Sequence, residues 1–227
     1  IHRVEIAGPA PIYRGSGVVD GWAHNPYQFS EFDGHLRVAT TLQGAAFLPP
    51  DGRNNLTNKV SVLALASDGL NPAGETTTFG DNEDIRSSRF MGERGFVVTF
   101  EQIDPLFAIN LSDPSAPFVA DSLEIPGFSS YIHPLGDDHL LTIGKSGGED
   151  GIGVSNTFQL QIFNIANAFD GDASTRISQD AVEEIEVADN EYAYSTAEYE
   201  PLAFNFLDDR NVCLLYTSPS PRDLSTS

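Results

Sequence analysis

Residues 89–117 read RFMGERGFVVTFEQIDPLFAINLSDPSAP, which is two apolar runs separated by a turn and closed by prolines. The first run, residues 95–100, is rich in β-branched and aromatic side chains without alternation, as is typical of a strand covered on both faces. Residues 105–111 form the second run, and Pro114 and Pro117 end it, because proline fixes φ and has no N–H to donate. This stretch therefore predicts two consecutive strands of a meander.

The flanking residues extend this pair to four strands. Residues 84–90 (DIRSSRF) precede it as a candidate inner strand. Residues 118–125 (FVADSLEI) alternate in part and end at Pro126 and Gly127, as expected of a more exposed outer strand. We therefore expect one four-stranded unit between residues 84 and 125.

The same order of strands and turns recurs along the chain. The further copies are residues 29–43 with 58–70, residues 128–147 with 158–172 and an outer strand VEEIEV at 182–187, and an incomplete copy at 200–212. Taking Phe32, Phe90, Ile132 and Phe204 as equivalent gives repeat lengths of 58, 42 and 72 residues. The shortest is close to the about 40–45 residues of a four-stranded propeller blade, and polar insertions account for the others.

These repeats predict an all-β fold, a partial β-propeller of four-stranded antiparallel blades over residues 1–212. We expect about three to four blades, truncated at both ends of the chain. A β-sandwich and a β-solenoid are the competing architectures, but a sandwich needs no repeat and a solenoid has a shorter, more regular one. No segment combines sustained 3.6-residue apolar spacing with helix caps, which argues against an α/β fold.

Acidic residues dominate the charge of the chain. Twelve Lys and Arg face 33 Asp and Glu, which gives a net charge of −21. Such a surface repels phosphate backbones, so we do not expect a nucleic-acid partner. The acidity suits a solubilising surface in salty surroundings, and clustered carboxylates that bind Ca²⁺ are the alternative.

The two ends of the sequence have their own features. No run approaches the about 18 apolar residues of a membrane span, and with neither an initiator Met nor a leader the chain is expected to be part of a longer product. Residues 213–227 (CLLYTSPSPRDLSTS) resemble translated sequencing-adapter read-through, which predicts a non-native tail; a genuine Ser/Pro-rich disordered tail is the alternative. Without Cys213 the body has no thiol for a disulfide, a zinc site or nucleophilic catalysis.

Three segments carry a family resemblance: RFMGERGFVVTF at 89–100, DPLFAINLSDP at 104–114 and IPGFSSYIHPLG at 125–136. With them the chain resembles the beta-propeller domain of secreted bacterial and archaeal proteins, a family distantly similar to WD-repeat propellers. The resemblance implies a propeller located outside the cell or in the cell envelope. It implies no activity that can be assigned to individual residues.

Three residues are candidates for ligand binding at the mouth of the channel. Arg89 lies on an expected inner strand, where it would pair with a carboxylate or bind an anionic ligand. His133 lies near the end of another inner strand, where it would bind a ligand or stabilise the turn before Pro134. Asp104 precedes Pro105 and would either contribute a carboxylate to the site or cap the turn.

Motifs for catalysis and metal binding are weak. The sequence contains no G-x-S-x-G, no H-E-x-x-H and no P-loop. His35 and His139 precede equivalent strands and are expected to be structural. Residues 79–84 (FGDNED), 147–151 (GGEDG) and 169–172 (FDGD) are acidic enough for Ca²⁺, although none matches the EF-hand loop. No cofactor is expected, and Ca²⁺ is the only candidate.

The leading hypothesis is a secreted or envelope-associated propeller that acts as a binding or scaffolding module for a protein or polysaccharide partner. Its rigid strands would present the long loops to that partner. A metal-dependent hydrolase or lyase with its site at the channel mouth is the alternative.

Overall fold

The computed structural model describes residues 1–44, 55–100, 104–125, 127–147, 154–171, 176–185, 195–207 and 209–215. Sixteen β-strands and three short 3-10 helices form this part of the chain, and no α-helix occurs in it. Within the same ranges, no helix has the length and apolar character that crossing a membrane requires. The expectation of an all-β fold is confirmed.

Three sheets have four antiparallel strands each, in simple sequence order. They are β3 (Phe29–Phe32), β4 (His35–Gln43), β5 (Leu56–Leu65) and β6 (Leu70–Glu75); β7 (Asp84–Met91), β8 (Arg94–Phe100), β9 (Asp104–Asn110) and β10 (Phe118–Ile125); and β11 (Phe128–Leu135), β12 (His139–Gly147), β13 (Val154–Asn164) and β14 (Ser178–Ile185). We call these sheets blades 1, 2 and 3. Blade 2 is the unit that the sequence predicts around residues 89–117.

Two smaller sheets and the 3-10 helices complete the described structure. Strands β1 (His2–Ile6) and β2 (Pro11–Ser16) form one antiparallel pair, and β15 (Phe204–Leu207) and β16 (Val212–Leu215) form the other. The 3-10 helices are η1 (Pro26–Gln28), η2 (Thr196–Glu198) and η3 (Pro201–Ala203). β16 extends beyond residue 212, while residues 216–227 lie outside the described part, so the non-native tail stays a prediction.

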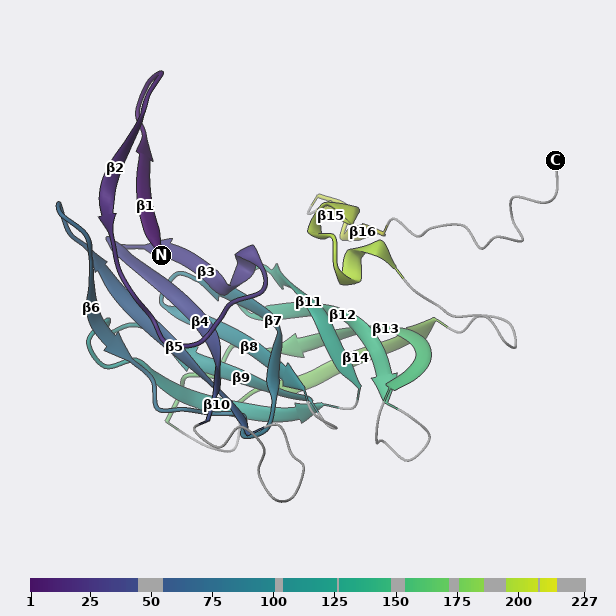
Figure 1. Ribbon diagram of the computed structural model, residues 1–227. Coiled ribbons are helices and arrows are strands. Elements are labelled where there is room, and N and C mark those ends of the chain that lie inside the picture. Colours follow the sequence, from purple (N-terminus) through teal and green to yellow (C-terminus); the bar gives the residue numbers. More distant parts are fainter. Residues whose placement is uncertain are drawn as a thin grey trace.

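The three blades follow one another side by side, as Figure 1 shows. The β1–β2 pair projects from one end of this row, and β15–β16 lies near its other end. The inner strands β7 and β11 contact each other, and η1 contacts β7. This arrangement of successive four-stranded sheets is that of a propeller in which the inner strands of neighbouring blades meet.

The alignment of the repeats from sequence is wrong in detail. Phe32 is the last residue before its hairpin turn and pairs with His35, but Met91 and Leu135 hold that position in blades 2 and 3. Phe90 is therefore one residue out of register, and Ile132 is three residues out. Local sequence cannot set this register because the apolar residues of the inner strands face different neighbours and the turns differ in length.

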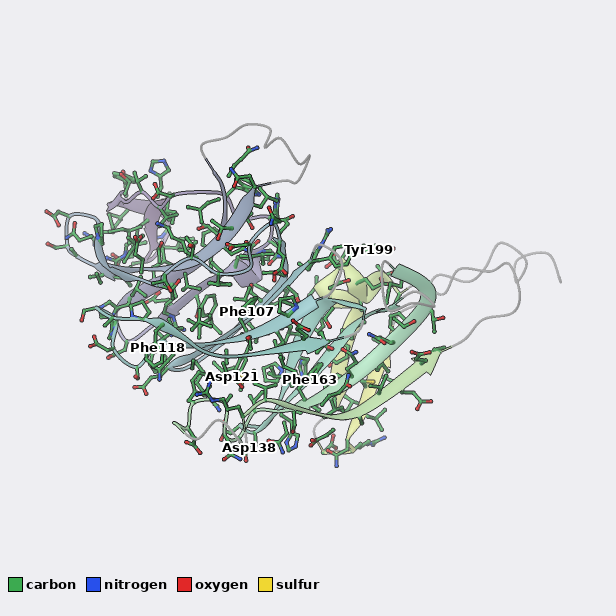
Figure 2. The ribbon with its side chains drawn as sticks, turned by 90° about the horizontal axis from the view of Figure 1, so that it is seen from below. Phe107, Phe118, Asp121, Asp138, Phe163 and Tyr199 are labelled. Carbon is green, nitrogen blue, oxygen red and sulfur yellow. The ribbon has the colours of Figure 1, made fainter. Side chains whose placement is uncertain are left out.

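Apolar clusters fill the spaces between successive sheets. Val60 and Val62 of blade 1 pack with Val97 and Ile109 of blade 2. Blades 2 and 3 enclose a second cluster that includes Phe96, Leu106, Ile132, Leu140 and Phe163. Figure 2 labels Phe163, which is completely buried at this interface. Burial of each such ring contributes about 1.5–3 kcal/mol, so packing between blades stabilises the row.

Side-chain donors also tie each blade to a backbone carbonyl of the next. Arg37 Nη1 lies 2.5 Å from the carbonyl oxygen of Gly92, and Arg94 Nη1 donates to Asp137 at 2.8 Å. Ser87 Oγ donates to the carbonyl oxygen of Ser129 at 2.6 Å. Such bonds fix the register between neighbouring blades, because each requires one particular carbonyl to face the donor.

Candidate functional site

Arg89 lies where the inner strands of blades 2 and 3 meet. Its Nε and Nη2 atoms both donate to the carbonyl oxygen of Ile132, at 2.9 and 2.7 Å. The guanidinium carbon lies 4.2 Å from the ring centroid of Tyr27 and 5.4 Å from that of Tyr131. In place of the expected carboxylate partner, the described residues give Arg89 a backbone carbonyl and two aromatic faces.

Tyr27 reaches Arg89 because the segment around η1 is rigidly held. Asn25 caps η1 by accepting a hydrogen bond from the Tyr27 amide at 3.0 Å. The completely buried side chain of Gln28 accepts from the amides of His24 and Asn25 and donates to the carbonyl oxygen of Ala39. These bonds anchor η1 on β4, so the Tyr27 ring can form an edge contact with Tyr131 of blade 3, 5.7 Å between centroids.

His133 lies two residues after Tyr131, on the same face of β11. Its ring centroid is 4.8 Å from that of Phe204 and 5.4 Å from that of Phe206, both on β15. The hydroxyl of Tyr131 lies 3.5 Å from His133 Nδ1. His133 thus faces the seam between blade 3 and the β15–β16 sheet, and these contacts bring it together with Arg89 through Tyr131.

We call this group the inner-strand cluster; its members are Tyr27, Arg89, Tyr131, His133, Phe204 and Phe206. Tyr131 and Phe204 are buried, whereas the other four side chains are partly exposed. Burial raises the pKa of the Tyr131 phenol, although the nearby Arg89 guanidinium opposes this effect. The phenol therefore stays protonated at neutral pH and can donate a hydrogen bond.

The third predicted site residue, Asp104, lies elsewhere. It is the first residue of β9 and pairs with Ile125 of the outer strand, so β8 separates its backbone from β7 and Arg89. Its side chain lies outside the described part of the structure. The structure thus brings together two of the three predicted residues.

The acidic stretch at residues 79–84 is organised around an amide. Asn58 Nδ2 donates to the carbonyl oxygens of Phe79, Gly80 and Glu83, at 3.3, 3.3 and 3.1 Å. Carbonyls that could ligate Ca²⁺ are therefore hydrogen-bonded to a neutral side chain. The other two candidate stretches fall partly outside the described residues, and within the described ones no three His, Cys, Asp or Glu side chains are grouped to hold a metal ion.

The two repeat-position histidines occupy equivalent places, each as the first residue of a second strand. His35 Nδ1 lies 2.8 Å from the carbonyl oxygen of Asp33 in the adjoining turn. His139 Nε2 lies 3.4 Å from Asp180 Oδ2 of β14. Both contacts lie within one blade, in keeping with the structural role expected of them.

Sequence reasoning missed the aromatic members of the cluster. Tyr131 and His133 are two residues apart on one strand. This spacing could have predicted that the two side chains lie together, because residues i and i+2 of a strand share a face. Tyr27 gave no such signal, since it belongs to η1, about a hundred residues away from Tyr131 in the chain.

Comparison with known proteins agrees with this architecture. The beta propeller domain family matches residues 1–222. An uncharacterized protein of Methanocaldococcus jannaschii is 36% identical over 152 residues, which cover 67% of this chain and 22% of that protein. An uncharacterized protein of Archaeoglobus fulgidus is 37% identical over 134 residues, 59% of this chain and 19% of that protein. The matched region thus spans about a fifth of each relative. On the strength of the family match, this chain belongs to the beta propeller domain family.

Proposed function

We propose that this chain is a non-enzymatic binding or scaffolding module of an extracellular or envelope-associated propeller protein. The observation that carries the proposal is the inner-strand cluster, to which blades 2 and 3, the β15–β16 sheet and the η1 segment all contribute. Strands and a capped 3-10 helix position these side chains before any partner arrives. A preorganised site of this kind reduces the entropy lost on binding.

The accessible groups of the cluster favour a partner with a carboxylate or a flat, hydroxyl-rich surface. The partly exposed guanidinium of Arg89 can bind carboxylates and stack on planar groups, and the partly exposed phenol of Tyr27 can donate a hydrogen bond. A protein side chain and an acidic sugar both offer this chemistry. Because the chain carries a net charge of −21, we expect one isolated acidic group to bind better than a polyanion.

Binding can be tested by titrating ¹⁵N-labelled chain with neutral oligosaccharides that carry a single uronic acid and with peptides that carry a single acidic side chain. We expect the Nε–H signal of Arg89 and the backbone amide signal of His133 to shift on titration, and Arg89→Met to abolish the shift of the His133 amide. Arg86→Met is the matched control, because Arg86 lies on the same strand with its guanidinium 5.1 Å from the Phe100 ring, outside the cluster. If neither probe shifts the signal, or if binding survives Arg89→Met, the proposed site is wrong.

The metal-dependent hydrolase or lyase is separable from this proposal by melting experiments. A divalent ion that binds only the folded chain raises its melting temperature by mass action. A rise on adding CaCl₂, together with cleavage of a polysaccharide substrate, would favour the enzyme. Unchanged melting with retained binding supports the binding module.

A further inference from the structure

The connection between β9 and β10 begins with an acceptor motif for N-linked glycosylation. Residues 110–112 read N-L-S, which fits the pattern N-x-[ST] with a residue other than proline in the middle. Residues 55–57, at the start of β5, read N-L-T and fit the same pattern. The sequence alone does not distinguish the two motifs, so their surroundings in the fold must do so.

Asn110 is the last residue of β9, and its side chain turns back toward the residues that follow. Its Oδ1 atom accepts hydrogen bonds from the backbone N–H of Ser112 at 3.0 Å and from Ser112 Oγ at 2.7 Å. Because a backbone N–H can only donate, the oxygen of the carboxamide must lie on this side. Nδ2 therefore lies on the side away from Ser112, and within the described part of the chain it donates no hydrogen bond.

The carboxamide of Asn110 is accessible and has an exposed aromatic neighbour. Asn110 is partly exposed, and its hydrogen bonds to Ser112 lie at the surface. Phe118 of the outer strand pairs directly opposite Asn110, so the two side chains share one face of blade 2. The Phe118 ring, labelled in Figure 2, is 52% exposed. A sugar attached to Asn110 could pack its apolar face on this ring.

The motif at residues 55–57 has different surroundings. Asn55 has a positive φ of 45°, and its side-chain amide lies so close to Gly44 that a Cβ at position 44 would clash with it. The hydroxyl of Thr57 donates to the carbonyl oxygen of Phe79 at 3.2 Å. Thus the third residue of this motif holds a neighbouring segment, whereas Ser112 holds the oxygen of Asn110. The structure favours Asn110 as the acceptor.

We propose that Asn110 is a site of N-linked glycosylation, which receives an oligosaccharide from a polyprenyl diphosphate carrier. In this transfer Nδ2 forms a bond to the anomeric carbon of the first sugar and loses one proton. The bond between that carbon and the diphosphate oxygen breaks, and the lipid diphosphate leaves with the electron pair. Such transfer takes place on exported chains, so the inference rests on the extracellular or envelope location in the proposed function.

Secretion of the full chain from yeast behind an added leader tests the site. Asn55→Asp serves as the background, because it leaves one N-x-[ST] motif and keeps a residue that tolerates positive φ. We expect intact mass spectrometry to show a glycan that endoglycosidase H trims to a single sugar, and peptide mapping to place it on Asn110. Asn110→Asp should lose the glycan, although it retains an acceptor oxygen for Ser112 and should fold.

Substitutions in the connection separate the motif from the local turn. Ser112→Ala should abolish the glycan, and Ser112→Thr should retain it, because the motif requires a hydroxyl at this position. Ser115→Ala is the matched control. Ser115 donates to Asp113 Oδ1 through its N–H and its hydroxyl, at 2.9 and 2.7 Å, as Ser112 does to Asn110. It lies outside the motif, so this variant should keep the glycan.

The position of the first sugar has its own measurement. The secreted chain trimmed to one sugar should melt at a higher temperature than the same chain made without glycan in the bacterial cytosol. Phe118→Ala should remove this difference. If the trimmed sugar raises the melting temperature equally in Phe118→Ala, the sugar does not pack on the ring and its proposed position is wrong.

Two results would overturn the site itself: a secreted chain without a glycan on Asn110, and a glycan on Asn110 that survives Ser112→Ala. A chain that is not secreted is purified from bacteria, incubated with an oligosaccharyltransferase and its lipid-linked oligosaccharide, and scored in the same way. Because the leader or the transferase is supplied, these failures concern Asn110 alone. Failure of the proposed function would appear separately, as loss of the Arg89-dependent binding response.

Discussion

Arg89 binds a backbone carbonyl because of where the inner strands meet. At the seam between β7 and β11 the Ile132 carbonyl faces the guanidinium, and the Tyr27 and Tyr131 rings flank it. The excess of acidic over basic residues predicts a carboxylate partner for any arginine of this chain. Geometry decides otherwise: the Ile132 carbonyl oxygen has two lone pairs, and the guanidinium is held where its Nε–H and Nη2–H both reach that oxygen.

Tyr131 offers a residue-scale prediction about pH. Because burial raises the pKa of its phenol, the folded chain holds the proton more tightly than the unfolded chain, where the pKa is about 10. The resulting stabilisation is complete below about pH 10 and is lost as pH rises through the folded pKa. Tyr131→Phe should therefore make the alkaline decline in unfolding free energy shallower, by up to about 1.4 kcal/mol per pH unit.

Urea denaturation at several alkaline pH values measures this slope. Tyr199→Phe is the matched control, because it removes a phenol whose side chain is 71% exposed, and it should keep the wild-type slope. Equal slopes for Tyr131→Phe and the wild type would show that Tyr131 does not contribute to the decline.

At the scale of elements, blade 1 and blade 2 touch through their backbones. A Cβ added to Gly74 on β6 would lie 2.6 Å from the carbonyl oxygen of Pro114 and 2.7 Å from that of Ser115. Because these are backbone atoms, Gly74→Ala must move the outer strand away from the β9–β10 connection. We expect a loss of about 1–3 kcal/mol in unfolding free energy, measured by urea denaturation.

Gly171→Ala is the control for the intrinsic effect of replacing glycine. A Cβ at Gly171 would meet no atom within 4 Å, so this change should stay within about 0.5 kcal/mol. If the two variants lose the same free energy, the close approach of β6 to blade 2 is not what restricts position 74.

The elements that the sequence predicts are those with local causes. The runs in β8 and β9 and the prolines after β9 define blade 2 without reference to other sheets. The Asp33-Gly34 turn is equally local, because both residues adopt the positive φ of a tight hairpin, 48° and 72°. Contacts between blades are different. The contact between Tyr27 and Tyr131 and the position of the β1–β2 hairpin both depend on packing between segments far apart in the chain. Local sequence patterns do not encode such packing.

At the scale of the whole molecule, the positive charges are few and several are already paired. Both lysines of the chain lie in ion pairs: Lys59 Nζ is 2.7 Å from Glu75 Oε2, and Lys145 Nζ is 3.4 Å from Glu198 Oε1. The 33 acidic residues outnumber the 12 Lys and Arg by 21. Their mutual repulsion opposes the compact state, and its range depends on ionic strength.

Salt should therefore stabilise the fold. The Debye length falls from about 30 Å at 0.01 M to about 3 Å at 1 M, so NaCl should raise the melting temperature by several degrees. The wild-type chain is the background for this test. Adding Glu31→Gln and Glu124→Gln, two exposed carboxylates on different blades, should raise the melting temperature at low salt.

That gain should shrink in 1 M NaCl, because screening already removes most of the repulsion that the two substitutions relieve. Differential scanning calorimetry at both salt concentrations measures the gain directly. If it is the same at low and high salt, the substitutions act through local contacts and self-repulsion does not limit the stability of this chain. If it disappears with salt, the acidity of the surface is tolerated only because surrounding ions screen it.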